Sequence, residues 1–469
     1  MDKISVYLLI FVHLAPAIYS VYHILLYKRD TRSALGWSIA CIFIPFGGPA
    51  AYFLFGINRV RSRAQNLKRQ LFEIGYEAGL TKSIPKGRFE KGIRAVGYHI
   101  TGSELSLVNN IEIFYNGEQA YPAMLDSIKQ ARSRILLTTY ILKTDKTGKA
   151  FIDALSEAVR RGVDVRVLVD GIGELYSWPK ASTLLIKNNV TVATFMPPSL
   201  FPPNINLNMR NHRKLLVIDD ELAFAGGMNI SDDNISVTSK ARKISDVHFS
   251  FHGSFVNYLS KIFYGDWLMA TGEQLIIDLN TSASNNGEMS CRVIPDGPGE
   301  EMDFLALTIQ AVIATASESI EIMTPYFLPS RELISSIQSA VLRGIRVRIV
   351  LPAKNNLFYM HWANRNILSE LLQLNIEIYY QAPPFSHSKL LCIDTEYCMV
   401  GSANLDPRSL RLNYEIGIEI FSERINALVR EHFDEVISTS TRLSRLELEN
   451  RSIPIRLRDS LVSLLSPYL

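Results

Sequence analysis

The sequence predicts an α/β protein in which two duplicated α/β domains share a central site and follow two transmembrane helices. The N-terminal region contains two long runs without charged residues, the remaining chain repeats one strand–helix–strand pattern, and each repeat ends in the same polar motif. With 47% hydrophobic residues, the chain is too apolar to be intrinsically disordered. Its 49 basic and 46 acidic residues leave a net charge of +3, which argues against a general nucleic-acid-binding protein.

The two charge-free runs are predicted to form a membrane anchor over residues 1–58. No Asp, Glu, Lys or Arg occurs at residues 4–27 or 33–58, and each run is long enough to cross a bilayer. The short connection makes the two spans neighbours in a hairpin whose ends face the same side of the membrane. A cleaved signal peptide is the alternative, because Ala15-Pro16-Ala17 resembles a cleavage site, but the apolar run continues to Tyr27.

Basic residues set the expected orientation of this hairpin. Its turn carries Lys28, Arg29 and Arg32, whereas more basic residues flank its two ends, which predicts a cytoplasmic body. Residues 59–104 contain few acidic residues and are predicted to form a basic juxtamembrane linker, lying against an anionic leaflet or simply solvated. The flanking and linker residues are Lys3, Arg59, Arg61, Arg63, Lys68, Arg69, Lys82, Lys86, Arg88, Lys91 and Arg94.

The rest of the chain repeats one pattern, which predicts a first domain at residues 105–285 and a second at residues 286–469. In the first copy, apolar residues 135–140 are followed by a helical segment at 150–161, Gly162 and an apolar run at 163–169. The second copy has the same order, with segments 320–326 and 333–343, Gly344 and segment 345–351. Strands separated by helices of this length favour parallel βαβ units, hence an α/β sheet flanked by helices in each half. Residues 279–290, rich in Asn, Ser and Thr, are the expected link.

A polar motif of the form H-x-K-x-x-x-x-D follows in each copy, and its internal spacing is the same in both. A His and a Lys two residues apart in a strand project to the same face, so each copy aims one imidazole and one ammonium group at a common point. The motif and the residues after it are His212, Lys214, Asp219, Gly226, Gly227 and Asn229 in the first copy, and His387, Lys389, Asp394, Gly401, Ser402 and Asn404 in the second.

Two such copies fit the displacement of an alkoxide from a phosphodiester. This reaction needs a nucleophile on one side of phosphorus, an acid on the other side, and cations around the equatorial oxygens. With the halves face to face, one His attacks and the other protonates, while Lys214, Lys389, Asn229 and Asn404 surround the phosphoryl group. No carboxylate cluster with metal-ligand spacing accompanies them, so we expect a metal-independent reaction through a phosphohistidine, without a cofactor. The symmetry of the copies leaves open which His is the nucleophile.

The paired motifs resemble those of the phospholipase D superfamily, and the match covers both halves. Within that superfamily, the chain is similar to the bacterial cardiolipin synthases, which implies a location in the bacterial cell membrane. The segments that carry this resemblance are Arg210-Asn211-His212-Arg213-Lys214, Thr324-Pro325-Tyr326-Phe327, Gly401-Ser402-Ala403-Asn404-Leu405-Asp406, Arg408-Ser409 and, in the second span, Ile44-Pro45-Phe46-Gly47-Gly48.

The resemblance also implies roles for the candidate residues. His212 is then the nucleophile and His387 the general acid. Acidic partners are expected to fix the tautomer of each imidazole. Glu415 matches the acid that follows the motif in the family, and Asp246 is its looser counterpart. A generic exposed carboxylate is an equally good interpretation of Asp246.

Other polar residues have less certain roles. Asp219 and Asp394 are candidates for the site, or they support the strand-to-turn backbone or bind a Lys. Residues 354–356 read Lys-Asn-Asn where the family commonly has an Asp, which puts the polar contact of that Asp in doubt. The four cysteines show neither metal-ligand spacing nor a disulfide framework, and they are Cys41, Cys291, Cys392 and Cys398.

The implied reaction transfers a phosphatidyl group from one phosphatidylglycerol to another, giving cardiolipin and glycerol. A membrane-bound phospholipase D or nuclease is the rival, because only the second nucleophile, water, differs. An inactive membrane scaffold is a third hypothesis, disfavoured because both His–Lys pairs are present. The expected partners are phosphatidylglycerol and anionic lipid, with no nucleic acid, and the oligomeric state stays open. Apolar residues 195–203 and 357–362 either dip into the membrane interface or are buried.

Overall fold

The computed structural model forms two compact units, Met1–Arg63 and Ala64–Leu469. Most of the expected basic linker and most of the expected link between the domains lie outside the described residues. The residues described are 3–28, 31–56, 92–200, 203–204, 209–235, 244–275, 289–298, 303–464 and 466.

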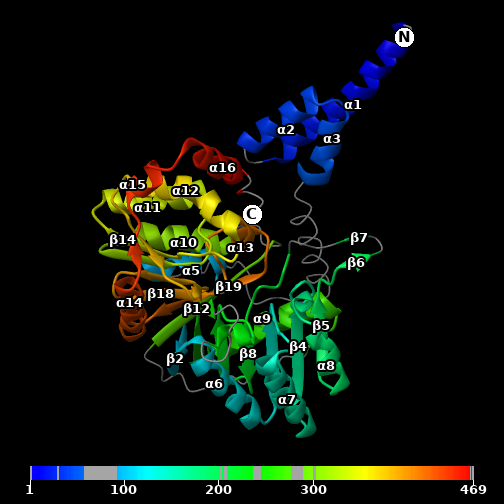
Figure 1. Ribbon diagram of the computed structural model, residues 1–469. Helices are drawn as coiled ribbons and strands as arrows, with labels where there is room; N and C mark the ends of the chain where they lie inside the picture. Colours follow the sequence, from blue (N-terminus) through cyan, green and yellow to red (C-terminus); the bar gives the residue numbers. More distant parts are fainter. Residues whose placement is uncertain are drawn as a thin grey trace. The chain divides into compact units, whose positions relative to one another are not determined.

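The N-terminal unit consists of packed helices (Figure 1). Its elements are α1 (Lys3–Tyr27), α2 (Thr31–Phe43), α3 (Gly47–Ala51) and the short π-helix η1 (Tyr52–Gly56). Helices α1 and α2 pack against each other around Ile24, Cys41 and Tyr52, so the two charge-free runs form neighbouring helices. In the described part of the chain, no helix has both the length and the apolar character needed to cross a bilayer.

The first half of the larger unit is built on a seven-stranded sheet in the order β2-β11-β9-β8-β3-β4-β5. Strands β3, β4 and β5 are parallel, as the βαβ pattern predicts, and the remaining neighbours are antiparallel. The elements are β2 (Asn110–Tyr115), α6 (Asn116–Gln130), β3 (Arg134–Thr139), α7 (Lys146–Arg160), β4 (Asp164–Asp170), η2 (Gly173–Tyr176), α8 (Ala181–Lys187), β5 (Thr191–Phe195), β6 (Ser199–Leu200), β7 (Pro203–Asn204), β8 (Leu215–Ile218), β9 (Leu222–Gly226), η3 (Asp232–Asn234), β10 (Ile244–Ser245), β11 (Val247–His252) and α9 (Val256–Thr271).

The second half repeats this sheet within nine strands, ordered β1-β12-β19-β18-β17-β13-β14-β15-β20. The seven strands from β12 to β15 correspond in order and direction to those of the first half, so the duplicated α/β fold is confirmed. The elements are β12 (Met289–Asp296), α10 (Phe304–Thr315), β13 (Ser319–Met323), α11 (Arg331–Leu342), β14 (Arg346–Pro352), α12 (Phe358–Leu372), β15 (Glu377–Gln381), β16 (Phe385–Ser386), β17 (Leu390–Ile393), β18 (Tyr397–Gly401), α13 (Pro407–Arg411), β19 (Glu415–Phe421), α14 (Glu423–Ser438), β20 (Thr441–Arg442), α15 (Arg445–Glu449) and α16 (Ile453–Ser463).

The segment before the first sheet contributes to the second half. Helix α5 (Ile93–Thr101) packs against α10 and β12, and β1 (Ser106–Val108) adds an antiparallel strand beside β12. The buried Arg292 donates to the carbonyl of Arg94 at 2.9 Å and pairs with Glu419 at 3.2 Å. The end of the expected linker and the first residues of the expected first domain are therefore tied to the second sheet.

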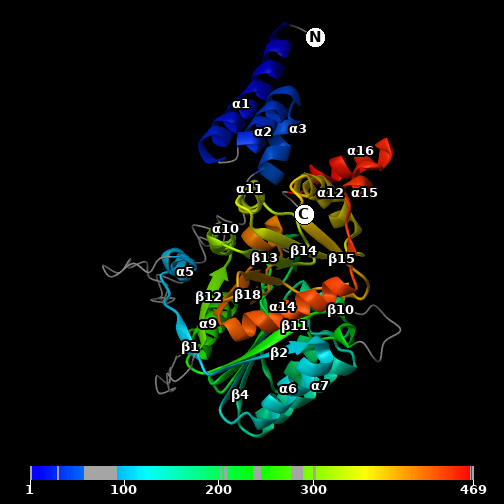
Figure 2. The same ribbon diagram turned by 90° about the vertical axis from the view of Figure 1, so that its left-hand side faces the viewer.

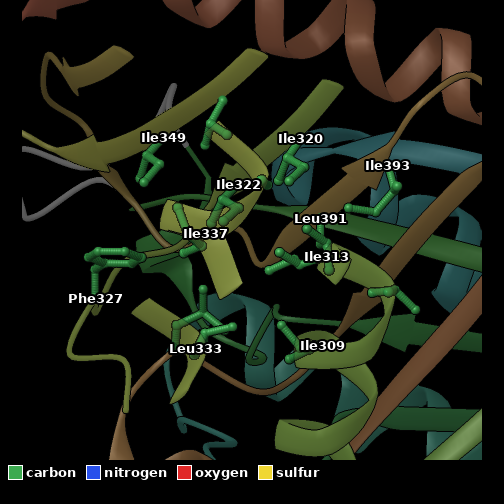
Figure 3. Packing of buried hydrophobic residues seen from close by; sticks show 14 of the residues in the cluster. Ile309, Ile313, Ile320, Ile322, Phe327, Leu333, Ile337, Ile349, Leu391 and Ile393 are labelled. Carbon is green, nitrogen blue, oxygen red and sulfur yellow. The ribbon is translucent and has the colours of Figure 1, made fainter. Parts of the chain in front are cut away.

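Each half has its own hydrophobic core, formed where helices cover the sheet. In the first half, α6 and α7 bury residues such as Ile128 and Phe151 against alternate strand residues, including Leu137. Figure 3 shows the equivalent core of the second half, where Ile309, Ile313 and Leu333 from the helices meet strand residues. Alternation in the strands places one set of apolar side chains on each face, so helices are needed on both faces.

The two halves join through short backbone contacts near the middle of the larger unit. Strand β10 of the first half pairs in parallel with β16 of the second half. The amide of His387 donates to the carbonyl of Ser245 at 2.7 Å, and the amide of His212 donates to the carbonyl of Tyr414 at 2.9 Å. In Figure 2 the strands of both halves lie between the outer helices. These contacts hold both polar motifs at the interface.

Candidate active site

The two His–Lys pairs lie just before strands β8 and β17, where the halves meet. Sequence reasoning placed each pair within a strand, but His212, Lys214, His387 and Lys389 all precede the strand that follows them. The reason is that the backbone amides of both histidines bond to the other half of the protein. The motif is therefore extended, as expected, but it bridges the domains.

Each imidazole is paired with a carboxylate from the other half. The Nδ1 atom of His212 lies 2.9 and 3.1 Å from the two carboxylate oxygens of Glu415. The Nδ1 atom of His387 lies 2.9 Å from Oδ2 of Asp246. Both carboxylates are fully buried, so the exposed interpretation of Asp246 is wrong. This crossed pairing leaves Nε2 of each ring as the reactive nitrogen.

The two lysines are buried beside the imidazoles. Nζ of Lys214 donates to the carbonyl of His212 at 2.5 Å, and Nζ of Lys389 donates to the carbonyl of His387 at 2.6 Å. The ammonium group of Lys214 also lies 5.5 Å from the ring centre of Tyr140, which contacts the His212 ring at 5.1 Å. The same local bond therefore holds both lysines in one repeated geometry.

Burial sets the protonation of the two histidines. It lowers the pKa of His212 well below the ordinary value, and the charges of Lys214 and Lys389 add to this effect. Burial and the charge of Lys389 also lower the pKa of His387 to about 4, against the bond to Asp246. Both imidazoles are consequently neutral near pH 7 when the site holds no anion.

The lysines are shifted in the same direction. Burial lowers the pKa of Lys214 to about 7, although Glu415 opposes the shift. Burial lowers the pKa of Lys389 to about 8, against the charge of Asp246. The two buried ammonium groups thus favour binding of an anion in the site, because a negative charge beside them stabilises their charged forms.

The two carboxylates differ, which breaks the symmetry of the site. Burial raises the pKa of Glu415 to about 7, against the charge of Lys214. Burial alone would also raise the pKa of Asp246, but the hydrogen bond and charge of His387 hold it below its ordinary value. Asp246 is therefore ionised near pH 7, whereas Glu415 is partly protonated.

The residue beside each carboxylate also differs between the two copies, being Gly227 beside Asp246 and Ser402 beside Glu415. A Cβ atom at Gly227 would lie 2.8 Å from Oδ1 of Asp246, so only glycine fits there without a shift. In the second copy Ser402 takes this place, and its hydroxyl donates to Oε2 of Glu415. The sequence showed that this position is Gly in one copy and Ser in the other, but it did not predict the contact with the acid of the same half.

Buried polar residues that sequence reasoning assigned no role support the first motif. Asn211 donates from Nδ2 to Asp266 at 2.9 Å, and Arg213 pairs with the same carboxylate and donates from Nε to the carbonyl of Glu415 at 2.9 Å. Arg210 pairs with Asp170 at 3.2 Å. Asn211 and Arg213 alternate with His212 and Lys214, and Arg210 directly precedes them, which is the signal that could have marked these residues.

The two asparagines of the motif lie next to the site without joining the His–Lys cluster directly. Oδ1 of Asn229 accepts a bond from the amide of Ile141 at 3.2 Å, beside Tyr140. Nδ2 of the buried Asn404 donates to the hydroxyl of Ser409 at 3.1 Å. Both side chains therefore brace loops that line the site.

Asp219 and Asp394 lie outside the site. Strand β8 separates Asp219 from Lys214, which is roughly 15 Å along an extended chain. Its carboxylate accepts bonds from the amides of residues 132–134 at 2.8 to 2.9 Å. Asp394 accepts the equivalent bonds from the amides of residues 317–319. These contacts support the structural alternative, in which each Asp holds the start of the neighbouring strand.

Exposed apolar side chains lie near the site in both halves. In the first half, Tyr176 of η2 lies 6.3 Å from the Tyr140 ring, and Leu175 and Trp178 nearby are exposed. In the second half, Asn355 and Asn356 bond to Pro325 and Tyr326, and Phe358 is exposed. Residues 354–356, where the sequence differs from the family pattern, thus place two side-chain amides against the 324–327 segment.

Within the described residues, no group of three or more His, Cys, Asp and Glu side chains is placed to hold a metal ion. The cysteines Cys41, Cys291, Cys392 and Cys398 are free and buried. Among the described residues, the structure brings together the two histidines, the two lysines, Glu415 and Asp246, with Asp406 and His248 also buried nearby. These groups combine nucleophilic, acidic and cationic functions around one point.

The duplicated sheet and this site define a protein built for displacement at a phosphodiester. A family profile described as "Cardiolipin synthase, PLD-like domain" matches residues 124–267 and 309–437, and a profile described as "Phospholipase_D-nuclease N-terminal" matches residues 15–56. The chain belongs to the phospholipase D-like cardiolipin synthase family, which confirms the resemblance seen in the sequence.

Curated relatives match almost the whole chain. A cardiolipin synthase of Oceanobacillus iheyensis is 31% identical, with 95% of each chain covered. The "Major cardiolipin synthase ClsA" of Bacillus subtilis is 30% identical, covering 94% of this chain and 95% of the relative. Among solved structures, the phosphatidylserine synthase of Haemophilus influenzae has a TM-score of 0.62 at 17% identity, covering 78% of this chain and 97% of that one, which shows a shared fold.

The structural role of Asp219 leads to a first prediction. Asp219 has a positive φ of 52°, which Ala tolerates poorly, so Asp219→Ala loses both the bonds and the favoured backbone. We expect a loss of on the order of 2 to 4 kcal/mol in unfolding free energy, and a smaller loss for Asp219→Asn. Turnover per folded molecule stays within about threefold of the wild type.

Thermal unfolding and turnover are measured on the same samples, with Asp394→Ala as the matched variant in the other half. Loss of turnover with unchanged thermal stability would place Asp219 in the catalytic machinery. The carboxylate pKa lies below its ordinary value, so its contribution is present near neutral pH and is lost as the pH falls through the folded-state pKa.

The lowered lysine pKa values predict that anion binding takes up protons. At about pH 8 Lys214 is mostly uncharged, and a bound anion raises its pKa, so sulfate binding takes up protons and weakens as the pH rises from about 7 to 9. Calorimetry in buffers of different ionisation enthalpy measures this uptake. Lys214→Met reduces it, whereas exposed Lys129→Met does not. Binding heats that are the same in every buffer would contradict the prediction.

Proposed function

We propose that this protein transfers a phosphatidyl group from one phosphatidylglycerol to another, releasing glycerol and forming cardiolipin. The observation that carries the proposal is the crossed arrangement of His212 with Glu415 and His387 with Asp246, with two lysines beside them. The similarity to curated cardiolipin synthases over nearly the whole chain supports the choice of lipid substrate.

In the proposed first step, Nε2 of His212 attacks phosphorus while the bond to the glycerol oxygen breaks. His387 gives its Nε2 proton to that oxygen, so glycerol leaves neutral. The Nδ1 proton of His212 stays on its bond to Glu415, and Lys214 and Lys389 stabilise the charge on the phosphoryl oxygens.

In the second step, a hydroxyl group of another phosphatidylglycerol attacks the phosphohistidine. His387, now neutral, takes the hydroxyl proton, and the bond between phosphorus and His212 breaks to release cardiolipin. The site is thereby returned to its starting protonation, and no other reactant is consumed. Water in place of the second lipid would give phosphatidic acid, which is the competing hydrolase reaction.

The difference between the two carboxylates supports this division of roles. An ionised Asp246 stabilises the charged form of His387, which an acid must reach. Glu415, with its pKa raised to about 7, offers less stabilisation to a charged His212, which suits a neutral nucleophile. In the empty site His387 is neutral, because burial lowers its pKa to about 4. The phosphodiester charge raises that pKa, so the proton enters with the substrate.

The N-terminal residues 1–58 are proposed to anchor the enzyme in the bacterial cell membrane through two spans, with the body on the cytoplasmic side. The charge-free runs at residues 4–27 and 33–58, and the match of residues 15–56 to an N-terminal family profile, support this role. The proposed domains are the linker at 59–104 and two catalytic domains at 105–285 and 286–469.

The product of the reaction tests the proposal. Full-length protein in mixed micelles with labelled phosphatidylglycerol is expected to give cardiolipin and an equal amount of glycerol, resolved by mass spectrometry. His212→Ala and His387→Ala, the controls, give no product, because nucleophile and acid act as a unit. Phosphatidic acid as the main product would instead identify a hydrolase. Complete loss of turnover in a chelator, restored by a divalent ion, would overturn the metal-independent mechanism.

A donor with a good leaving group separates the roles of the two histidines. Phosphatidyl p-nitrophenol needs no protonation of its leaving group, so His387→Ala retains the first step with this donor but not with phosphatidylglycerol. Because the variant also lacks the base for the second step, acid quenching after one turnover traps label on a peptide containing His212. Label on His387 in the His212→Ala variant, with none on His212 in the reverse experiment, would exchange the two roles.

A further inference from the structure

Helix α16 presents its apolar side to solvent. Ile453, Leu457, Leu461 and Leu464 recur every three or four residues, which places them on one stripe of the helix and the residue after it. Their exposed fractions are 71%, 61%, 65% and 73%. A surface helix normally turns such a stripe toward the core, so the polarity of α16 is reversed.

The opposite side of α16 is fixed to the protein by a buried charge. Asp459 is fully buried and pairs with Arg458 at 2.6 Å, with Arg365 of α12 at 3.9 Å, and with Arg451. Val462 packs beside the cluster of Leu328, Met360 and Ala363. Rolling the helix to bury the leucines would bring the paired carboxylate into solvent and leave Arg365 without it. The buried ion pairs of Asp459 therefore hold α16 with its apolar stripe facing outward.

Neighbouring groups extend the stripe and surround it with positive charge. Figures 1 and 2 show α16 lying against α12, and the guanidinium of Arg458 stacks on Trp362 at 4.1 Å. Trp362 in turn contacts the exposed Phe358 ring at 4.9 Å. Arg456 and Arg458 flank the stripe, and the one acidic residue of α16 is the buried Asp459. Apolar residues bordered by arginines match the boundary between lipid chains and anionic headgroups.

This surface adjoins the active site. Helix α12 begins directly after the loop whose Asn356 accepts a bond from Tyr326 at 2.8 Å. The Tyr326 ring lies 6.5 Å from Phe385, which lies 6.0 Å from the His387 ring. A partner seated on α16 and Phe358 is thus within a few side chains of the catalytic histidine.

We propose that the docking surface, made of Ile453, Leu457, Leu461, Leu464 and Phe358 with Arg456 and Arg458, lies in the interface of an anionic lipid bilayer. This contact is separate from the proposed N-terminal anchor. It orients the catalytic body so that lipid reaches the site from the membrane plane. The geometry of α16 carries the proposal without reference to turnover.

Depth-dependent quenching tests the contact directly. The described native cysteines are buried, so Leu457→Cys in the full-length protein accepts an environment-sensitive NBD label. In vesicles of phosphatidylcholine with about one third phosphatidylglycerol, the label is expected to shift to the blue and to lose at least half its intensity with brominated lipid. The matched control is Ile186→Cys on α8, where Ile186 is 60% exposed, and it stays unquenched.

Other occupants of the surface give different results. A blue-shifted label that brominated lipid does not quench places the stripe against protein and overturns the proposal. A shift that then depends on the protein-to-lipid ratio identifies a second copy of the chain, and a constant shift identifies the N-terminal unit. The proposal is also overturned if the label at position 457 reports an environment as polar and as open to solvent as the label at position 186.

A kinetic test, which rests on the proposed function, uses Leu457→Gln with Leu461→Gln. Because both side chains are exposed, thermal stability is expected to be unchanged. Turnover of phosphatidylglycerol in vesicles falls on the order of tenfold, while turnover of monomeric dihexanoyl phosphatidylglycerol stays within twofold. Wild-type rates on vesicles would overturn the docking role. Absence of turnover in the wild type would count against the proposed function alone, since quenching needs no reaction.

Discussion

The crossed hydrogen bonds between imidazoles and carboxylates are the constraint on which the rest of the larger unit depends. His212 of the first half is oriented by Glu415 of the second, and His387 by Asp246 of the first. Neither half contains both members of an imidazole–carboxylate pair. The two halves must therefore be positioned as precisely as the side chains of the site. The backbone bonds from both histidine amides to the opposite half meet this requirement, because they fix the motif and its partner together.

The same arrangement also buries charged side chains. Lys214 and Lys389 are buried, and of the two carboxylates that bond to the imidazoles Glu415 is partly protonated near pH 7. In the empty site, burial lowers the pKa of both lysines and so destabilises their charged forms. A bound phosphodiester places a negative charge beside the lysines and raises their pKa values, so its binding returns protons to groups that burial had neutralised. In the proposed mechanism, the charge that binds the substrate thus also protonates the acid.

The sequence predicted the duplicated α/β fold and the meeting of the two His–Lys pairs, because repeated spacing is a property of the chain itself. The same spacing could not predict where the Asp219 side chain lies. It shows that His212 and Asp219 flank a short strand, but not which end of that strand belongs to the site. Nor could it show that β1 and α5 join the second sheet, or that each acid crosses to the other half. These features depend on contacts between residues distant in sequence. The sequence also did not predict the outward-facing apolar side of α16. Periodicity can reveal an apolar stripe on a helix, but it does not show whether that stripe faces the core or the solvent.

The departures from symmetry matter as much as the repeat. A duplicated site begins with two equivalent histidines, yet the reaction needs one that stays neutral and one that gains and loses a proton. The Gly227 position brings the backbone close to Asp246, whereas Ser402 donates a hydrogen bond to Glu415. The hydrogen bond from His387 helps to keep the pKa of Asp246 below its ordinary value, whereas burial raises the pKa of Glu415 to about 7. The hydrogen bond from Ser402 lowers the pKa of Glu415, yet burial outweighs it, so two like imidazoles are paired with unlike carboxylates. In the proposed mechanism this difference suits one His to act as nucleophile while the other carries the proton in both steps.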